Sequence, residues 1–216
     1  RCYVGVDQGQ FIVFRRDRFV AWLGEQLRRN RPYDEIVMEM AAAQGLWTGR
    51  PATNFITAAV ANGNLDENKL AGRTVRAFLG QRIDCAQCHD HPFDKWTQQD
   101  FEGLAAYFGQ TQTSIAGVED KAKTVKGKPI EYIVEDRDTL EKRDVAPRVP
   151  FHADWADDVG SRREQLSAWL THPDNRRFER AIANRVWGLL FGRPFHAPVD
   201  DLPDPPEPGS VDLLSI

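Results

Sequence analysis

The chain has 216 residues, of which 41% are hydrophobic and 10% aromatic, so it can bury a sizeable core. Its 28 basic and 32 acidic residues give a formal net charge of −4, which excludes the global positive field that holds nucleic acid. No run approaches the roughly 18 apolar residues that cross a bilayer, so no membrane span is expected in this chain. The first residues lack the pattern of a signal peptide, and the abrupt start and end are typical of a piece of a longer polypeptide.

The first part of the chain is predicted to be helical. Apolar residues recur at helical spacing over residues 15–30, with arginines on the other face. A second helix is expected from Asp34, a capping residue, to about Gln44. A third apolar segment over 53–62 and a fourth over 66–80 continue the helical pattern.

The second part mixes two patterns. Thr97 and Asp100 resemble a capping box and predict a helix that ends at Gly109. Residues 111–150 are rich in lysine, glycine and turn signals, which favours a β-hairpin or an extended excursion.

Two further helices are expected before the end of the chain. Ser161 and Glu164 form a second capping box, which predicts a helix to about Trp169. Residues 174–192 read as a strong amphipathic helix, and the prolines and acids that follow preclude regular structure.

The pattern C-A-Q-C-H at residues 85–89, in the stretch CAQCHDHPFDKW, carries the most specific chemistry. C-x-x-C-H is the pattern of c-type haem attachment, in which two thiolates add to the haem vinyl groups and the histidine coordinates iron. Cys85 and Cys88 would fall about one turn apart on a short helical segment, and His89 would project towards the metal. The sequence therefore predicts haem c, with His89 as the proximal ligand of the iron.

Neighbouring residues are assigned supporting roles. His91 lies too close to His89 to reach the opposite face of the iron, so it is expected to bind a propionate or the loop backbone. Trp96 offers an aromatic wall with an N–H donor, and it serves equally well as a core anchor for the following helix. Cys2 is expected to be an incidental thiol.

Other chemistries fit the same atoms. Cys85, Cys88, His89 and His91 could supply two sulfurs and two nitrogens to zinc, although structural zinc sites normally draw their ligands from two separate segments. A disulfide, a redox-active dithiol or plain structural cysteines are the remaining alternatives, although the strand that leads into a typical dithiol site is missing. Haem ranks first on spacing, and the alternatives stay open.

A haem iron takes a second axial ligand or keeps an open distal face. The candidates for that ligand are His152, His172, His196, Met38 and Met40. Sequence spacing does not select among them, and each one alone is more typical of a surface or core residue.

The stretch RTVRAFLGQRIDCAQCHDHPFDKWTQQDFEGLAAYFGQT resembles the signature of a planctomycete cytochrome-type domain family of unknown function. The helical region before it is similar to the lead-in of the same family, so the resemblance covers residues 17 to about 112. Residues 176 to about 208 resemble the start of the companion domain that follows in those proteins, with the pair Asn184-Arg185, Trp187 and an FGRP turn.

The resemblance implies a secreted or cell-envelope protein in which this module is joined to other domains of the same polypeptide. It carries over Cys85, Cys88 and His89 as haem-attachment residues and His91 as a signature residue without an assigned role. Covalent haem attachment implies a periplasmic or otherwise exported location.

Together these observations predict a mainly α fold with a short β-hairpin or extended excursion, and with the motif in a loop between two helices. We expect a cytochrome-type helical domain over 1–112, an extended or β insertion over 113–158 and the helical start of the companion domain over 159–216. The predicted function is a c-type haem-binding redox or electron-transfer module with a redox partner protein. Catalysis is less expected, because no Ser-His-Asp order, phosphate loop or carboxylate pair stands out, and Asp200-Asp201 is interpreted as a solvated loop.

Overall fold

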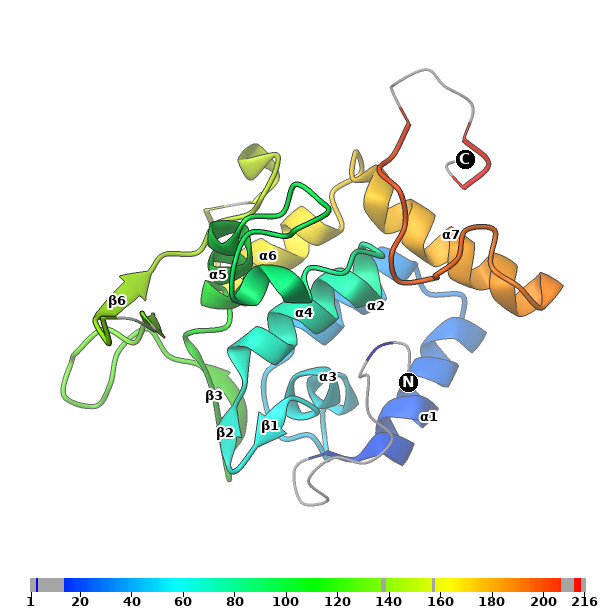
Figure 1. Cartoon of the computed structure of the whole chain (residues 1–216). Helices are drawn as coiled ribbons and strands as arrows, with labels where there is room; N and C mark the ends of the chain where they lie inside the picture. The colour runs from blue at the N-terminus through cyan, green and yellow to red at the C-terminus, as the bar shows by residue number, and fades with distance from the viewer. Residues whose placement is uncertain (1–2, 4–13, 137–138, 157, 207–211, 215–216) are drawn as a thin grey trace.

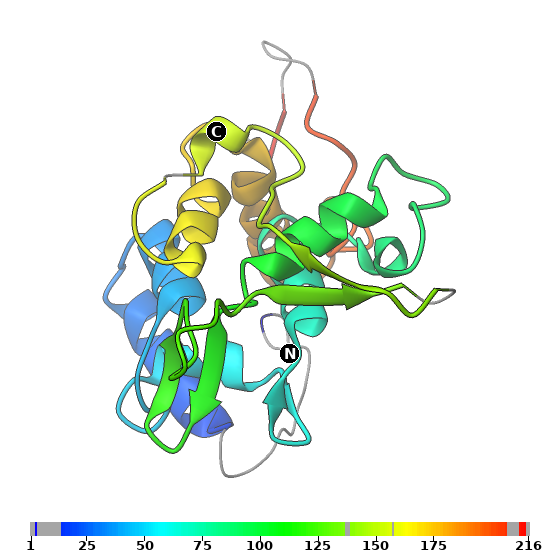
Figure 2. The same cartoon turned by 90° about the vertical axis from the view of Figure 1, so that its left-hand side faces the viewer.

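The computed structural model describes residue 3 and residues 14–136, 139–156, 158–206 and 212–214. Figures 1 and 2 show packed helices accompanied by short strand pairs. Cys2 lies outside the described residues, so its expected role as an incidental thiol stays a prediction.

The first two predicted helices are present. Helix α1 spans Arg16–Arg28 and turns Phe19 into the core, while its arginines face solvent. Helix α2 spans Tyr33–Ala42 and is buried along one side. Asp34 is not its cap, because the helix begins directly after Pro32; the aspartate lies in the first turn, where its charge is favourable to the helix dipole.

Residues 53–62 do not form the predicted third helix. They belong to a short helical turn and a hairpin, whose bounds are η1 Pro51–Thr53, α3 Asn54–Thr57, β1 Val60–Ala61 and β2 Asn64–Leu65. Asn62 and Gly63 both have positive φ, at 52° and 83°, which is the backbone of a two-residue hairpin turn. The prediction of a helix over 53–62 was wrong because the pair Asn62-Gly63 at its end is the strongest short hairpin signal.

Two helices with side-chain caps enclose the motif. Their bounds are α4 Glu67–Phe78 and α5 Gln98–Ala106. The Asp66 carboxylate caps α4 by accepting a hydrogen bond from the Lys69 amide at 2.9 Å, and Thr97 with Asp100 forms the predicted capping box of α5. The two helices pack against each other, and the chain between them contains the 3₁₀ turn η2, Asp84–Gln87. The motif therefore lies between two helices, as predicted.

The extended excursion after α5 contains two antiparallel hairpins. They are β3 Thr111–Ser114 with β4 Gly117–Asp120, and β5 Tyr132–Glu135 with β6 Lys142–Val145. Together with β1 and β2 they make three two-stranded pairs in the described part of the chain. Helices remain the main element, but the fold is mixed α/β. The prediction of a mainly α fold with a short β-hairpin or extended excursion is therefore confirmed in part: helices predominate, but three strand pairs accompany them.

The last third of the chain is built into the helical body. A 3₁₀ turn, η3 Ala153–Trp155, precedes α6 Arg162–Leu170 and α7 Arg176–Phe191. The predicted capping box of Ser161 and Glu164 opens α6, and Gly192 ends α7 in the left-handed conformation, with φ 76°. Helix α6 packs on α2, and α7 packs on α4 (Figure 1).

One cluster of buried apolar side chains extends from Phe14 to Leu170. Its largest fully buried members include Trp169, Phe55, Phe78, Phe101 and Phe108. Burial of such a side chain stabilises the fold by roughly 1.5–3 kcal/mol relative to exposure. Because the cluster draws on helices from α1 to α6, these helices share one core.

Among the described residues, we find no helix with the length and apolar content needed to pass through a bilayer.

Candidate functional site

The motif loop, residues 83–96, lies at the surface between α4 and α5. Within the loop, Ile83 and Ala86 are buried, and the Ala86 amide donates to the Ile83 carbonyl at 2.9 Å to begin η2. Trp96 is 2% exposed and fixes the other end of the loop in the core. The loop is therefore anchored at both ends, while most residues between the anchors face solvent.

Cys85 and Cys88 are both exposed and carry thiols. The Cys88 amide donates to the Cys85 carbonyl at 3.4 Å, so the two residues stand at the ends of a single tight turn. Next to them, the Asp84 carboxylate pairs with the guanidinium of Arg76 on α4. This geometry leaves both sulfurs accessible to a reactant that approaches from solvent.

The ring of His89 is exposed, and its Nδ1 lies 2.7 Å from the carbonyl oxygen of Asp90. A carbonyl oxygen can only accept, so this contact requires a proton on Nδ1. In the neutral ring the lone pair is then on Nε2, which has the form of a metal-ligating histidine that donates its other N–H to a backbone carbonyl. In the neutral ring, this contact leaves Nε2 as the nitrogen that can coordinate a metal ion.

His91 has the opposite arrangement. Its backbone amide donates to the Trp96 carbonyl at 2.8 Å, and its Nδ1 accepts from the Phe93 amide at 3.3 Å. In the neutral ring the proton is therefore on Nε2, and the loop backbone occupies the remaining lone pair. Among the described residues, no group of three or more His, Cys, Asp or Glu side chains converges as a metal site.

Trp96 forms a wall of a cavity of about 740 Å³ that lies beside the motif loop. Its indole N–H donates to the Asp94 carboxylate at 3.1 Å, and the Arg177 guanidinium lies 5.9 Å from the ring centroid. Phe151, His152 and Trp155 line the same cavity. Trp96 is thus both a core anchor and part of a cavity wall.

The five candidates for a distal ligand lie in different surroundings. Met40 is completely buried in the core, whereas Met38 is 39% exposed on the same helix. His152 and His172 both stack on the Trp155 indole, with ring centroids 4.1 and 4.6 Å away. The His196 backbone is held by the Asn184 side chain through two hydrogen bonds. Of these residues, His152 shares the cavity that Trp96 lines.

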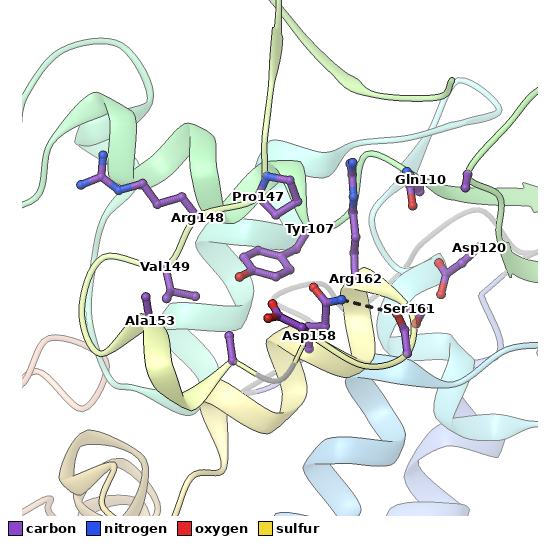
Figure 3. A pocket seen from close by; sticks show the side chains of 14 residues that line it. Tyr107, Gln110, Asp120, Pro147, Arg148, Val149, Ala153, Asp158, Ser161 and Arg162 are labelled. Atoms are coloured by element: carbon purple, nitrogen blue, oxygen red, sulfur yellow. Dashed lines mark hydrogen bonds between the residues drawn. The ribbon is translucent and has the colours of Figure 1, made fainter. Parts of the chain in front are cut away.

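A second cavity, of about 680 Å³, lies between α6 and the extended excursion (Figure 3). Tyr107 and Asp158 point towards each other across it, and burial raises the pKa of the Tyr107 hydroxyl. Arg162 on its wall bonds the Glu131 carboxylate at 2.5 Å and the Ala106 carbonyl at 3.3 Å. Contacts within the protein therefore engage the guanidinium of Arg162, and this residue lies far along the chain from the motif loop.

Sequence reasoning missed the ionic contacts that surround the motif loop. Arg82 pairs with Asp200 at 2.7 Å, and Lys95 pairs with Asp204 at 2.5 Å. Asp200 and Asp201 lie in a loop, as interpreted, and Asp201 is exposed, but the side chain of Asp200 is only 22% exposed and pairs with Arg82. The partners are more than a hundred positions apart, and no periodicity or spacing in one sequence links them.

Comparisons with known families match two parts of the chain. Residues 8–113 match the family model PSCyt2, described as Protein of unknown function (DUF1549). Residues 162–216 match the model PSD1, described as Protein of unknown function (DUF1553). No curated protein and no solved structure matches the chain.

Proposed function

We propose, for a chain that joins a DUF1549 domain to the start of its usual companion, a DUF1553 domain, that the motif loop is a covalent attachment site for c-type haem. Cys85 and Cys88 carry the thioether links, and His89 is the proximal ligand. The module transfers electrons to or from a redox partner as part of a larger exported or periplasmic polypeptide.

The observation that carries the proposal is the state of the two histidines. His89 presents Nε2 with its lone pair, because the Asp90 carbonyl holds the proton on Nδ1. His91 has its Nδ1 lone pair engaged by the Phe93 amide. The loop thus prepares one histidine for coordination and not both, as C-x-x-C-H chemistry requires.

The residues of the chain have separate tasks in this function. Bound haem supplies one-electron redox chemistry at its iron. The tight turn that begins at Cys85 keeps two thiols accessible for attachment. The Asp90 carbonyl orients the His89 ring and makes Nε2 more basic as a ligand.

The proposal is tested with the full chain produced in a bacterial host that matures cytochromes c. We expect a Soret band and a covalent mass increment that survives denaturation. Both should be lost in the Cys85→Ala/Cys88→Ala double variant. A colourless protein of unmodified mass, from a host that loads a control cytochrome c, would overturn the proposal.

A matched pair of histidine variants separates haem from the zinc alternative. We expect His89→Ala to change the spectrum of the attached haem, because the proximal ligand is gone, and His91→Ala to leave it unchanged. Equal dependence of a bound metal on both histidines, with no haem attached, would instead favour a site with two sulfur and two nitrogen ligands. A mass lower by two hydrogen atoms than that of the dithiol, without metal or haem, would identify a disulfide.

A further inference from the structure

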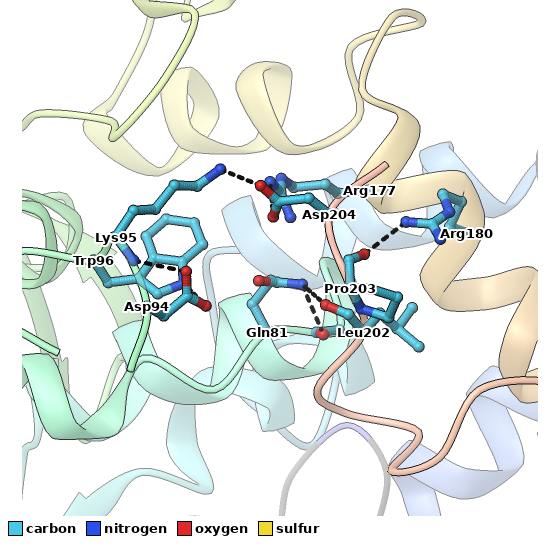
Figure 4. A network of polar contacts seen from close by, with 10 residues as sticks. Gln81, Asp94, Lys95, Trp96, Arg177, Arg180, Leu202, Pro203 and Asp204 are labelled. Atoms are coloured by element: carbon cyan, nitrogen blue, oxygen red, sulfur yellow. Dashed lines mark hydrogen bonds and ion pairs between the residues drawn. The ribbon is translucent and has the colours of Figure 1, made fainter. Parts of the chain in front are cut away.

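Residues 200–204, which we call the strap, belong to the region that matches DUF1553 and run alongside the start of the motif loop (Figure 4). The Leu202 amide donates to the Gly80 carbonyl at 2.7 Å, and the Gln81 side-chain amide donates to the Leu202 carbonyl at 2.6 Å. The Leu202 side chain is 5% exposed and covers Gly80, where an added Cβ would come within 3.0 Å of it. Backbone and side-chain contacts therefore fix the strap next to the loop.

The two ends of the strap hold the two ends of the motif loop. Asp200 binds Arg82, directly before the loop, at 2.7 Å. Asp204 binds Lys95, at the far end of the loop, at 2.5 Å. Between these two cations lie all the residues assigned to attachment, so one five-residue segment brackets the site on both sides.

Helix α7 holds the strap from the other side. Arg177 binds Asp204 at 2.5 Å while its guanidinium lies 5.9 Å from the Trp96 ring centroid. Arg180 donates to the Pro203 carbonyl at 2.8 Å. The side chain of Arg177 is only 9% exposed, so removal of its carboxylate partner would leave a buried charge without this ion pair.

We infer that the strap positions the motif loop, and that Asp200 and Asp204 are positioning residues contributed by the companion region to a site that the DUF1549 region carries. The role of the strap in haem attachment rests on the proposed function; its role in ordering the loop does not. Pro203 lacks an N–H and has a fixed φ, which favours the extended form that keeps the two carboxylates apart. The companion region is thus a structural part of the motif site.

The ordering role is tested on haem-free full-length protein by hydrogen exchange. In the Asp200→Asn/Asp204→Asn variant we expect amides of residues 83–96 to exchange roughly tenfold faster, because charge-assisted hydrogen bonds at both ends are weakened. Exchange in α2 should stay unchanged. The Asp200→Glu/Asp204→Glu variant keeps both charges and should restore most of the protection.

Two controls make the outcome decisive. Asp154→Asn removes an exposed aspartate on η3 and should leave loop exchange unchanged. Should the double asparagine variant fail to fold, Lys95→Gln serves in its place, because it removes only the exposed ion pair between Lys95 and Asp204. It should accelerate exchange at residues 91–96. Unchanged loop exchange in a folded double variant or in Lys95→Gln, or equal acceleration by Asp154→Asn, would overturn the inference.

A second readout separates this inference from the proposed function. If the chain takes up haem, the double asparagine variant should show a lower attached fraction than wild type under equal expression, and the glutamate variant should recover it. If the asparagine variant attaches as much haem as wild type, the strap orders the haem-free loop but has no role in haem attachment. A chain that never takes up haem would refute the proposed function and leave the exchange result valid.

Discussion

Arg163 carries a charged side chain that has no exposed surface, so contacts within the protein must replace its hydration. It binds Asp120 at 2.7 Å and donates to the carbonyls of Ala41 and Ala43 at 3.1 and 2.9 Å. These contacts connect α6 to the end of α2 and to β4. A buried charge is tolerated here because several acceptors surround it.

We predict that Arg163→Met destabilises the protein by about 3–5 kcal/mol, because it leaves Asp120 as a partly buried carboxylate without its partner. The free energy of unfolding from urea titration measures the effect. Arg29→Met is the control: Arg29 pairs with Glu25 on an exposed face, so we expect a change within about 0.5 kcal/mol. A small effect of Arg163→Met would show that this network contributes little to stability.

The two aspartates of the strap, Asp200 and Asp204, predict that the free energy of unfolding depends on pH. Partial burial alone would raise the pKa of Asp200, but hydrogen bonding and the charge of Arg82 outweigh it, so the pKa lies below its usual range. The pKa of Asp204 is lowered in the same way, because Lys95 and Arg177 outweigh the effect of burial. Their contribution to stability is present above the pKa of an unfolded aspartate and is lost as pH falls through the lowered pKa of the folded state.

We therefore expect wild type to exceed the Asp200→Asn/Asp204→Asn variant in free energy of unfolding at pH 7, and the gap to shrink as the pH falls below the pKa of an unfolded aspartate, about 3.9, and through the lowered pKa of the folded state. Urea titrations at several pH values measure the gap. A difference that stays constant or grows in acid would show that these carboxylates do not stabilise the fold through their charge.

At the residue scale, sequence spacing located the motif residues but not the states of their side chains. C-x-x-C-H singled out Cys85, Cys88 and His89 from local pattern alone. The tautomers of His89 and His91 depend on backbone atoms one or two residues away, whose positions require the loop conformation. The contacts of Lys95 and Arg82 depend on a segment more than a hundred positions away.

Helix α5 begins at Gln98, with only its cap Thr97 between it and the motif loop, and its capping box orients the end of that loop. Thr97 accepts from the Asp100 amide at 3.1 Å, while the Asp100 carboxylate accepts from the Thr97 amide at 3.0 Å. The Asp90 carboxylate also accepts from the Gln98 amide at 2.9 Å, which adds a cap from within the loop. Loop and helix therefore stabilise each other.

We predict that Thr97→Ala costs about 1 kcal/mol of stability, because one amide of the first turn loses its acceptor. Thr97→Ser retains the hydroxyl and should cost only a small fraction of that. Thermal and urea unfolding of the three proteins measures the difference. Equal losses in both variants would attribute the effect to the methyl group of threonine rather than to the cap.

Elements that a capping box opens were predicted correctly. Helices α5 and α6 each begin at a predicted capping box, and both formed close to the expected bounds. Residues 53–62 carried one ambiguous signal, since apolar residues before Asn62-Gly63 suit a helix end or a hairpin equally. The hairpin formed because residues 60–61 pair with residues 64–65 across that turn.

At the scale of the whole molecule, the two family regions share their interior. Leu166, Trp169 and Leu170 of α6, from the DUF1553 match, belong to the same buried cluster as the helices of the DUF1549 match. The predicted division into 1–112, 113–158 and 159–216 stays a prediction about sequence organisation. The regions that match DUF1549 and DUF1553 cannot be separated without exposing large apolar side chains of their common core.

We expect a fragment of residues 1–158 to lack a cooperative unfolding transition, because it loses Trp169, Leu170 and the buried Arg163 at once. The full chain should unfold in a single transition. Near-ultraviolet circular dichroism with urea titration compares the two. A cooperative transition in the fragment would show that the DUF1549 region folds by itself.

The shared interior also constrains how such genes can change. The region that matches DUF1549 contains Ala41 and Ala43, whose carbonyls accept from Arg163, and Arg82 and Lys95, which pair with the strap. Each family region therefore carries contacts complementary to the other. A recombination event that exchanged one region for that of a distant relative would bring together surfaces with unmatched charges and unfilled volume. Coordinated substitutions on both sides of the junction would preserve this match.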